Sequence, residues 1–260
     1  MKLKKKSEIA LMREAGQLLW QAHMIAADMA EAGVTTEAID AEVEKFIIGH
    51  NAVPLFKGVP GEVPFPATCC MSVNEEVVHG IPSSRQLAEG DIISVDIGLK
   101  INGWCADCAC THAIGTIDDE KRALMDATEE CLRIAIKDIR PGVKWSKIAK
   151  KMAKHARNCG FSVVESLVGH GIGESMWEPP QVPNYFSRNC TDFRIKQGMV
   201  IAVEPMINAG VKDVETLSDH WTIVTKDRRP SAHFEHTIAV TAAGAQVMTC
   251  GPNGEGWALD

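Results

Sequence analysis

The chain has 260 residues, of which 45% are hydrophobic and 23% are charged, the balance of an ordinary soluble globular protein. A formal net charge of −7 argues against binding to DNA or to an anionic membrane through the surface as a whole. The sequence shows neither a membrane span nor a signal peptide, so its nine cysteines are expected to be free thiols in a reducing cytoplasm.

The first half of the chain is predicted to fold as two helices followed by a β-hairpin. Apolar residues recur at helical spacing over 7–31, with Ser7 as the expected N-cap, and a second helix is expected over Thr36–Gly49. The segment Ala52–Pro66 is rich in proline and glycine and is expected to be a loop. Two strand-like runs then flank Asn102-Gly103, a pair typical of hairpin turns, and the predicted strands are Ile92–Lys100 and Trp104–Ile114.

The second half repeats this order of two helices and then strands. A helix is predicted over 119–139, and Pro141-Gly142-Val143 opens a shorter one that ends near Cys159-Gly160. The predicted strands that follow are Ser162–Leu167, Met199–Asn208, His220–Val224 and His233–Thr241.

The repeat is also visible between individual segments. Gly33-Val34 and Gly142-Val143 precede similar helices, and the strand that ends in Asp96 aligns with the strand that ends in Glu204. We therefore expect a single catalytic domain of two pseudo-symmetric halves, about 1–115 and 116–250. Facing halves would bring Asp96 and Glu204 into one cleft.

Asp96 and Glu204 each interrupt a run that otherwise reads as a buried strand. A buried carboxylate without a partner is costly, so each needs a cation, a hydrogen-bond network or a proton. A salt bridge or a capping role would explain either residue alone, whereas the matched positions favour a shared cation. Each half also carries a second acid, Asp107 and Glu235. Four carboxylates and one imidazole could hold two divalent ions about 3.5–4 Å apart, of the Mn²⁺, Fe²⁺, Co²⁺ or Zn²⁺ type.

At these residues the sequence resembles the type I methionine aminopeptidases over essentially its whole length. The motifs that carry the resemblance are Val78-His79-Gly80-Ile81-Pro82, Asp96-Ile97-Gly98 with Asp107, Gly169-His170-Gly171-Ile172-Gly173, Glu204-Pro205 and Phe234-Glu235-His236-Thr237. The resemblance implies the α/β "pita-bread" fold, which is internally duplicated and has a mainly antiparallel curved sheet with helices on its outer face.

The resemblance also implies roles for individual residues. The implied ligands of two divalent metal ions are Asp96, Asp107, His170, Glu204 and Glu235. Glu204 would in addition handle the proton of the attacking water, and His79 would contact the substrate near the scissile amide. Four residues match or vary positions that line the family's methionine pocket, namely Phe65, Cys70, Met176 and Trp221.

One departure from the family concerns its second active-site histidine, which hydrogen-bonds the substrate carbonyl. Trp177 stands at that position. An indole donates one hydrogen bond but neither accepts one nor carries a charge. Loss of one donor of this kind costs on the order of 10²–10³ in rate, so either the indole substitutes, the activity is weak or the substrate has changed. The proline-rich loop around Glu62 also differs from the family's tyrosine-rich segment.

Other clusters are interpreted as structural. Cys105, Cys108 and Cys110 lack a matching second pair for zinc, and strand alternation would point Cys105 and Cys108 to opposite faces. Among the remaining histidines, His233 is the best additional candidate, because it lies two residues from Glu235 and would face the same cleft.

The leading hypothesis is therefore a cytoplasmic, monomeric, metal-dependent aminopeptidase that hydrolyses the N-terminal methionine from polypeptides. Its expected partners are the N-terminal segments of polypeptides, including nascent chains at the ribosome. Two alternatives stay open. One is an X-Pro peptidase of the same fold, although such relatives usually carry an extra N-terminal domain. The other is a low-activity paralogue that binds nascent chains or a partner, which Trp177 would favour.

Overall fold

The computed structural model describes residues 2–187 and 192–259. Within this part of the chain the helices are α1 (Lys6–Met29), α2 (Thr36–Gly49), α3 (Asp119–Asp138) and α4 (Trp145–Asn158). The strands in the first half are β1 (Val53–Pro54), β2 (Cys69–Val73), β3 (Glu76–Val78), β4 (Ile92–Ile101) and β5 (Trp104–Ala113). Those in the second half are β6 (Ser162–Val163), β7 (Gly169–Gly171), β8 (Glu178–Val182), β9 (Val200–Val203), β10 (Met206–Asn208), β11 (Val214–Thr216), β12 (Ile223–Thr225), β13 (Ser231–His233), β14 (His236–Thr241) and β15 (Gly244–Val247).

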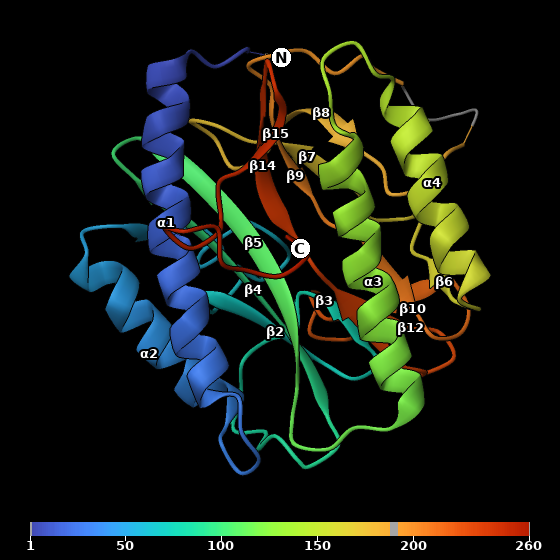
Figure 1. Cartoon of the computed structure of the whole chain (residues 1–260). Coiled ribbons are helices and arrows are strands. Elements are labelled where there is room, and N and C mark those ends of the chain that lie inside the picture. The colour runs from blue at the N-terminus through green and yellow to red at the C-terminus, as the bar shows by residue number, and fades with distance from the viewer. Residues whose placement is uncertain (1, 188–191, 260) are drawn as a thin grey trace.

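Two larger sheets form the centre of the molecule (Figure 1). In the first, β4 pairs with β5 along one edge and with β1 and β2 along the other. The second has the strand order β15-β14-β9-β7-β8. Two small sheets, β13-β10-β6 and β11-β12-β3, complete the arrangement, and all these strand pairs are antiparallel.

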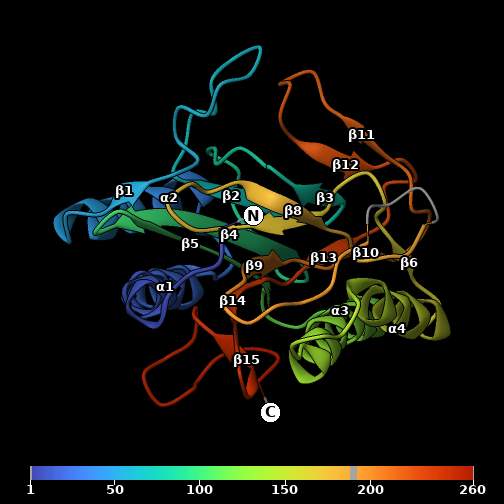
Figure 2. The same cartoon turned by 90° about the horizontal axis from the view of Figure 1, so that it is seen from above.

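Each larger sheet is covered by its own pair of helices. The apolar face of α1 carries Met12, Ala15, Leu19 and Ala26 at helical spacing, and most of it packs with α2 against β2, β4 and β5. The helices α3 and α4 form a second core with β9, β10 and β14. Figure 2 shows α1, α3 and α4 on one side of the sheets, while the loop before β2 and the β11–β12 hairpin rise on the other.

The predicted fold class is confirmed, since the chain forms a pita-bread α/β fold with antiparallel sheets and helices on the outer face. The hairpin turn at Asn102-Gly103 has positive φ angles of 52° and 84°, as a two-residue turn of this kind requires. None of the helices in the described residues is long and apolar enough to cross a membrane.

The start of α1 differs from the prediction. Lys5, not Ser7, is the N-cap residue, and its backbone N–H donates a 2.7 Å hydrogen bond to the Glu8 carboxylate. Glu8 occupies the third helical position, from which a glutamate can reach back to the cap. The prediction of Ser7 as N-cap is therefore wrong, because an acid in the first turn fixes the start of the helix instead.

Several predicted strands are broken or shortened. The run 199–208 divides into β9 and β10 around Glu204-Pro205, and the run 233–241 divides between β13 and β14 around Glu235. Proline has no N–H for the ladder, which explains the first break. The prediction over 162–167 holds only for β6, and the strand expected over 220–224 is β12 instead.

Candidate metal centre

The first sheet brings two carboxylates to one face. Asp96 lies on β4 and Asp107 on β5, where Asp107 pairs with Gly98 across the hairpin. Because alternate residues of a strand face the same side, Asp96, Gly98 and Asp107 share a face. The sequence places both acids in long runs of buried residues, so their side chains meet inside the protein.

The second sheet supplies two more carboxylates at the breaks in its strands. Glu204 directly follows β9 and Glu235 directly precedes β14, next to the paired residues Val203 and His236. The backbone N–H of Glu235 donates a 2.8 Å hydrogen bond to the carbonyl of Ala109 on β5. This contact fixes the second pair of acids against the first.

His170 lies on β7, between two glycines in a narrow space. A Cβ atom at Gly169 would lie 2.4 Å from the Ala202 carbonyl oxygen, and one at Gly171 would lie 2.5 Å from the Pro179 carbonyl oxygen. Only glycine lets β7 pass this close to its neighbours. The glycines on either side of His170 are thus required for close packing of β7, and this packing fixes the position of the imidazole.

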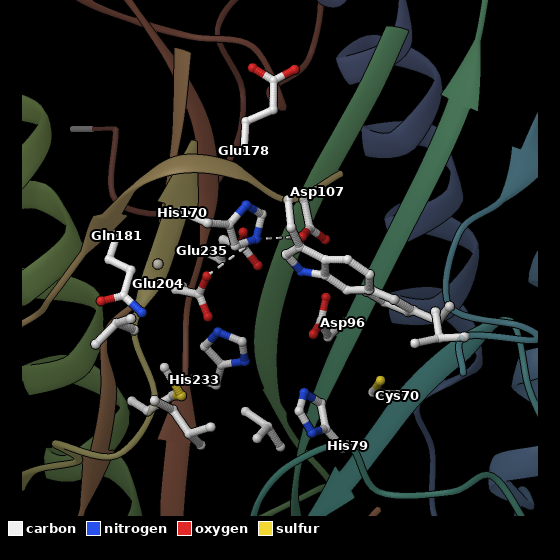
Figure 3. Close-up of a pocket in the computed structure, with 18 of the residues that line it drawn as sticks. Cys70, His79, Asp96, Asp107, His170, Glu178, Gln181, Glu204, His233 and Glu235 are labelled. Atoms are coloured by element: carbon white, nitrogen blue, oxygen red, sulfur yellow. Dashed lines mark ion pairs between the residues drawn. The ribbon is translucent and has the colours of Figure 1, made fainter. Parts of the chain in front are cut away.

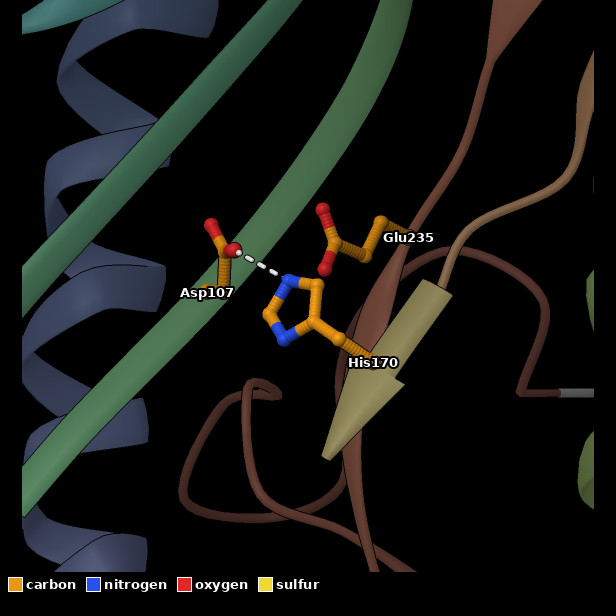
Figure 4. A group of neighbouring side chains, drawn as sticks. All are labelled: Asp107, His170 and Glu235. Atoms are coloured by element: carbon orange, nitrogen blue, oxygen red, sulfur yellow. Dashed lines mark ion pairs between the residues drawn. The ribbon is translucent and has the colours of Figure 1, made fainter. Parts of the chain in front are cut away.

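The orientation of the His170 ring points one nitrogen at the acids. Its Nδ1 lies 2.9 Å from the Gly171 carbonyl oxygen, to which it can donate. Its Nε2 lies 3.4 Å from Asp107 Oδ2 and 3.6 Å from Glu204 Oε1. Ligand atoms of Asp107, His170 and Glu235 all lie within 4.8 Å of one another, a grouping that can hold a metal ion (Figure 4).

The electrostatics of this cluster are those of crowded, buried acids. Burial, together with the neighbouring carboxylates, raises the pKa of Asp96 and of Glu235 well above the ordinary range and that of Glu204 to about 8. Burial alone would lower the pKa of His170, but Asp107 and Glu204 outweigh it and raise this pKa to about 9.

Three oxygens of the cluster show that its residues fit a divalent cation. Within the described residues, one carboxylate oxygen each of Asp96, Asp107 and Glu235 is buried without a hydrogen-bond partner. Buried polar atoms are normally satisfied. A metal ion among these carboxylates and the His170 imidazole would satisfy all three, and the donor set is the one that Mn²⁺, Fe²⁺, Co²⁺ and Zn²⁺ accept.

The five acidic and imidazole residues line a cavity of about 550 Å³ (Figure 3). Part of its wall is apolar and consists of Phe56, Val59, Phe65, Cys70 and Trp221. Phe65 and Trp221 meet edge to face with ring centroids 5.3 Å apart, and the Trp221 indole donates to the Val63 carbonyl at 2.7 Å. Of the four residues predicted for a substrate pocket, Phe65, Cys70 and Trp221 therefore line the cavity.

Met176 and Trp177 take different positions. Met176 is buried with Phe56 and Cys70 in the apolar cluster but does not itself line the cavity. Trp177 lines the cavity with 56% of its surface exposed, and its ring centroid lies 6.5 Å from that of His170. The indole therefore lies at the solvent-exposed margin of the cavity.

Two further histidines and one glutamine complete the polar wall. His79 lines the cavity, and burial lowers its pKa to about 4. His233 lines it too and is almost fully buried. Gln181, which pairs with His170 across β7 and β8, was not foreseen, because a glutamine after two prolines gives no signal in the sequence. Cys105, Cys108 and Cys110 take no part in the metal-type grouping found among the described residues.

Comparison with known proteins points to one family. Residues 10–242 match metallopeptidase family M24. The chain is 45% identical over 242 residues to methionine aminopeptidase 1 of Bacillus subtilis, covering 93% of this chain and 96% of that protein. It superimposes with a TM-score of 0.91 on the crystal structure of methionine aminopeptidase from Rickettsia prowazekii, at 35% identity, covering 96% of this chain and 99% of that one. A prolidase from Pyrococcus horikoshii shares the fold: it is 18% identical, with a TM-score of 0.77, and the match covers 96% of this chain and 63% of that one.

Proposed function

This chain belongs to metallopeptidase family M24, and on that premise we propose that it hydrolyses the N-terminal methionine from polypeptides. The observation that carries the proposal is the buried cluster of four carboxylates and one imidazole on the wall of a cavity that is otherwise partly apolar. The acids supply a metal centre, and the apolar wall accepts an uncharged side chain beside it.

The proposed metal ligands are the four carboxylates and one imidazole that lie together on the cavity wall, namely Asp96, Asp107, His170, Glu204 and Glu235. Their number and their oxygen-rich chemistry suit two divalent ions of the Mn²⁺, Fe²⁺, Co²⁺ or Zn²⁺ type. Ions held by these residues would supply Lewis-acid chemistry, which activates a water and polarises the scissile carbonyl.

The remaining chemistry falls to side chains of this protein. Glu204 takes the proton of the attacking water, since its carboxylate lies in the cluster beside His170. His79 contacts the substrate at the scissile amide, and as a neutral imidazole it donates one hydrogen bond and accepts another. Phe65, Cys70 and Trp221 enclose the methionine side chain, whose thioether packs well against aromatic rings.

The wider setting of the proposal is a monomeric enzyme of the cytoplasm that acts on N-terminal segments, nascent chains at the ribosome included. A net charge of −7 supports a substrate that binds through its terminal residues and not through a large basic surface. The X-Pro alternative has support from the fold alone, because the prolidase likeness lies at 18% identity.

A direct assay tests the proposed function. Metal-free protein is supplied with Mn²⁺ or Co²⁺ and incubated with Met-Ala-Ser and, separately, with Ala-Pro. We expect release of methionine from the first peptide only, and loss of that release in Asp107→Asn and with excess chelator. Release of alanine from Ala-Pro alone would instead favour an X-Pro peptidase. Binding of Met-Ala-Ser without cleavage, whatever the ion, would favour the low-activity paralogue.

A further inference from the structure

His233 stands at the end of β13, with its backbone held firmly. Its N–H donates to Thr111 Oγ1 at 2.9 Å, and its carbonyl accepts from the same hydroxyl at 2.8 Å. The residue is 1% exposed and lines the cavity described above. The position of the ring is therefore set by β5 and β13 and not by contacts of the imidazole itself.

The ring makes no polar contact that would explain its burial. Within the described residues, neither Nδ1 nor Nε2 of His233 has a hydrogen-bond partner. His233 is also outside the metal-type grouping of Asp107, His170 and Glu235. An unsatisfied buried polar group costs on the order of 1–3 kcal/mol, so two such nitrogens in one ring call for a functional explanation.

The surroundings of the ring indicate what it could bind. In the view of Figure 3, His233 lies between Glu204 and His79, the two residues assigned to the attacking water and to the scissile amide. Trp177, in contrast, is more than half exposed at the margin of the cavity. A peptide bound with its scissile bond between the metal ligands and His79 would bring its main chain next to His233.

We infer that His233 is a further catalytic residue, which donates a hydrogen bond from its imidazole to a main-chain oxygen at the scissile bond. An imidazole carries an N–H in either neutral tautomer and when protonated, so a donor is available in every state. His233 thereby supplies the cavity with a substrate-facing imidazole, which Trp177 does not provide. The inference rests on the proposed function and adds a residue to its mechanism.

Two substitutions at position 233 test the inference. His233→Phe keeps an aromatic ring but removes both nitrogens, whereas His233→Gln keeps an N–H donor and an acceptor. With Mn²⁺ and Met-Ala-Ser, we expect His233→Phe to lower kcat by roughly 10- to 100-fold, somewhat less than the largest effects of single oxyanion donors, with little change in KM. His233→Gln should retain kcat within about threefold of the unsubstituted protein.

Thermal unfolding separates this role from a structural one. If the nitrogens serve only the substrate, His233→Phe removes two unsatisfied polar atoms and the Tm of the metal-free protein rises by roughly 2–4 °C. Mn²⁺ affinity, measured by calorimetry, should be unchanged, because His233 is not assigned as a ligand. A lower Tm with unchanged kcat would overturn the inference, and so would a kcat loss explained by weaker Mn²⁺ binding.

A binding experiment distinguishes failure of this inference from failure of the proposed function. The probe is the ketomethylene analogue of Met-Ala, which cannot be hydrolysed, added to Zn²⁺-loaded protein labelled with ¹⁵N-histidine. We expect the ring ¹⁵N and N–H signals that are missing from His233→Phe to shift on addition of the analogue. Absence of methionine release by the unsubstituted protein would contradict the proposed function, whereas ring signals that do not move would contradict the role of His233.

Discussion

The resemblance to the type I methionine aminopeptidases predicts that Trp177 occupies the position of their second active-site histidine. The indole is 56% exposed and stands edge-on to His170, whereas the ring of His233 is buried in the same cavity. If His233 already donates to the substrate, a second imidazole at position 177 has little to add. We therefore expect Trp177→His to change kcat for Met-Ala-Ser by less than tenfold.

The same substitution should have a larger effect once His233 is disabled. In the His233→Phe protein, Trp177→His supplies an imidazole, which unlike the indole can also accept a hydrogen bond and carry a charge, so kcat should rise by at least tenfold. Trp177→Phe is the matched control, because it changes the ring without supplying an imidazole and should give no such rise. A tenfold gain from Trp177→His in the otherwise unsubstituted protein would contradict this division of labour between the two positions.

The sequence predicts the residues of the cluster better than the direction of every side chain. Asp96 and Glu204 each interrupt an apolar run, and the glycines around His170 mark a strand under steric constraint, so these positions give a signal. Met176 gives none, because whether it lines the cavity or packs behind its wall depends on the loop that carries it. The unsatisfied nitrogens of His233 likewise become apparent only in three dimensions.

Strand β7 has little room for larger side chains at its two glycines. A Cβ atom at Gly171 would lie 2.5 and 2.8 Å from the carbonyl oxygens of Pro179 and Glu178. These are backbone atoms, which cannot rotate away as the end of a flexible side chain can. Gly171→Ala should lower the free energy of unfolding by about 1–3 kcal/mol, as overpacking does, and should weaken metal binding by displacing His170. Urea unfolding of the metal-free protein and Mn²⁺ calorimetry measure the two effects.

Gly49 at the end of α2 provides the matched control. No atom lies within 4 Å of a Cβ built there, and its φ is not in the left-handed region. Gly49→Ala should leave the free energy of unfolding unchanged or raise it by up to about 1 kcal/mol. If the two substitutions proved equally harmless, close packing around β7 could not be the reason for its glycines.

The segment before α1 holds the loop between β7 and β8 in place. Lys4 Nζ lies 2.6 Å from Glu178 Oε2, with the Lys4 side chain 2% exposed, and the Glu178 carboxylate also accepts from the Ser175 N–H. Lys4→Met would leave Glu178 without its cation, at a cost of about 1–3 kcal/mol. We expect faster hydrogen exchange over 173–178 and, because this loop carries Trp177, a higher KM for Met-Ala-Ser.

Lys2→Met is the control for that experiment. Lys2 pairs with Glu174 in the same loop at 2.6 Å, but both side chains are more than half exposed. Exposed pairs of this kind contribute little to stability. Hydrogen exchange over 173–178 should therefore stay close to that of the unsubstituted protein, and equal effects of the two substitutions would argue that burial of the Lys4 pair is unimportant.

At the scale of elements, the sequence predicts the helices closely and the strands of the second half poorly. Helices α2 and α3 match their predicted ranges to within a residue, because their apolar spacing extends over many residues. The predicted run 199–208 is continuous in hydrophobicity, whereas the structure breaks it at Glu204-Pro205. Short strands such as β3 and β7 depend on pairing with distant segments, which local pattern does not reveal.

For the whole molecule, we propose one domain of two related halves, about 1–115 and 116–250. The arrangement of the acids supports this proposal, since each half contributes two from neighbouring antiparallel strands: Asp96 and Asp107 from β4 and β5, Glu204 and Glu235 from the ends of β9 and β14. Each sheet also has its own helix pair and core. Only when the halves meet are the four acids concentrated, so their repulsion is a property of the whole fold.

The burial and crowding of these acids set the pH dependence of the metal-free protein. The raised pKa of Glu204, about 8 against 4.5 for an ordinary glutamate, means that the folded state keeps a proton which the unfolded chain has released. The same holds for His170 between 6.5 and about 9. Where the folded state binds more protons, stability falls as pH rises. We therefore expect the Tm of the metal-free protein to fall between pH 7.5 and pH 8.5.

The chosen pH window isolates the cluster from the other buried histidines. Burial lowers their folded-state pKa values to about 3 or 4, so above pH 7.5, one unit beyond the ordinary histidine pKa of 6.5, they are largely neutral in both states; they are His23, His79, His112, His233 and His236. Divalent ions replace the protons of the cluster, so the rise in Tm on adding Mn²⁺ should be larger at pH 8.5 than at pH 7.5. Glu235→Gln removes one crowded acid and should flatten both trends, while Glu165→Gln, which alters an exposed pair with Lys212, should leave them intact. A metal-free Tm that rises across this window would show that the acids do not carry the protons their burial implies.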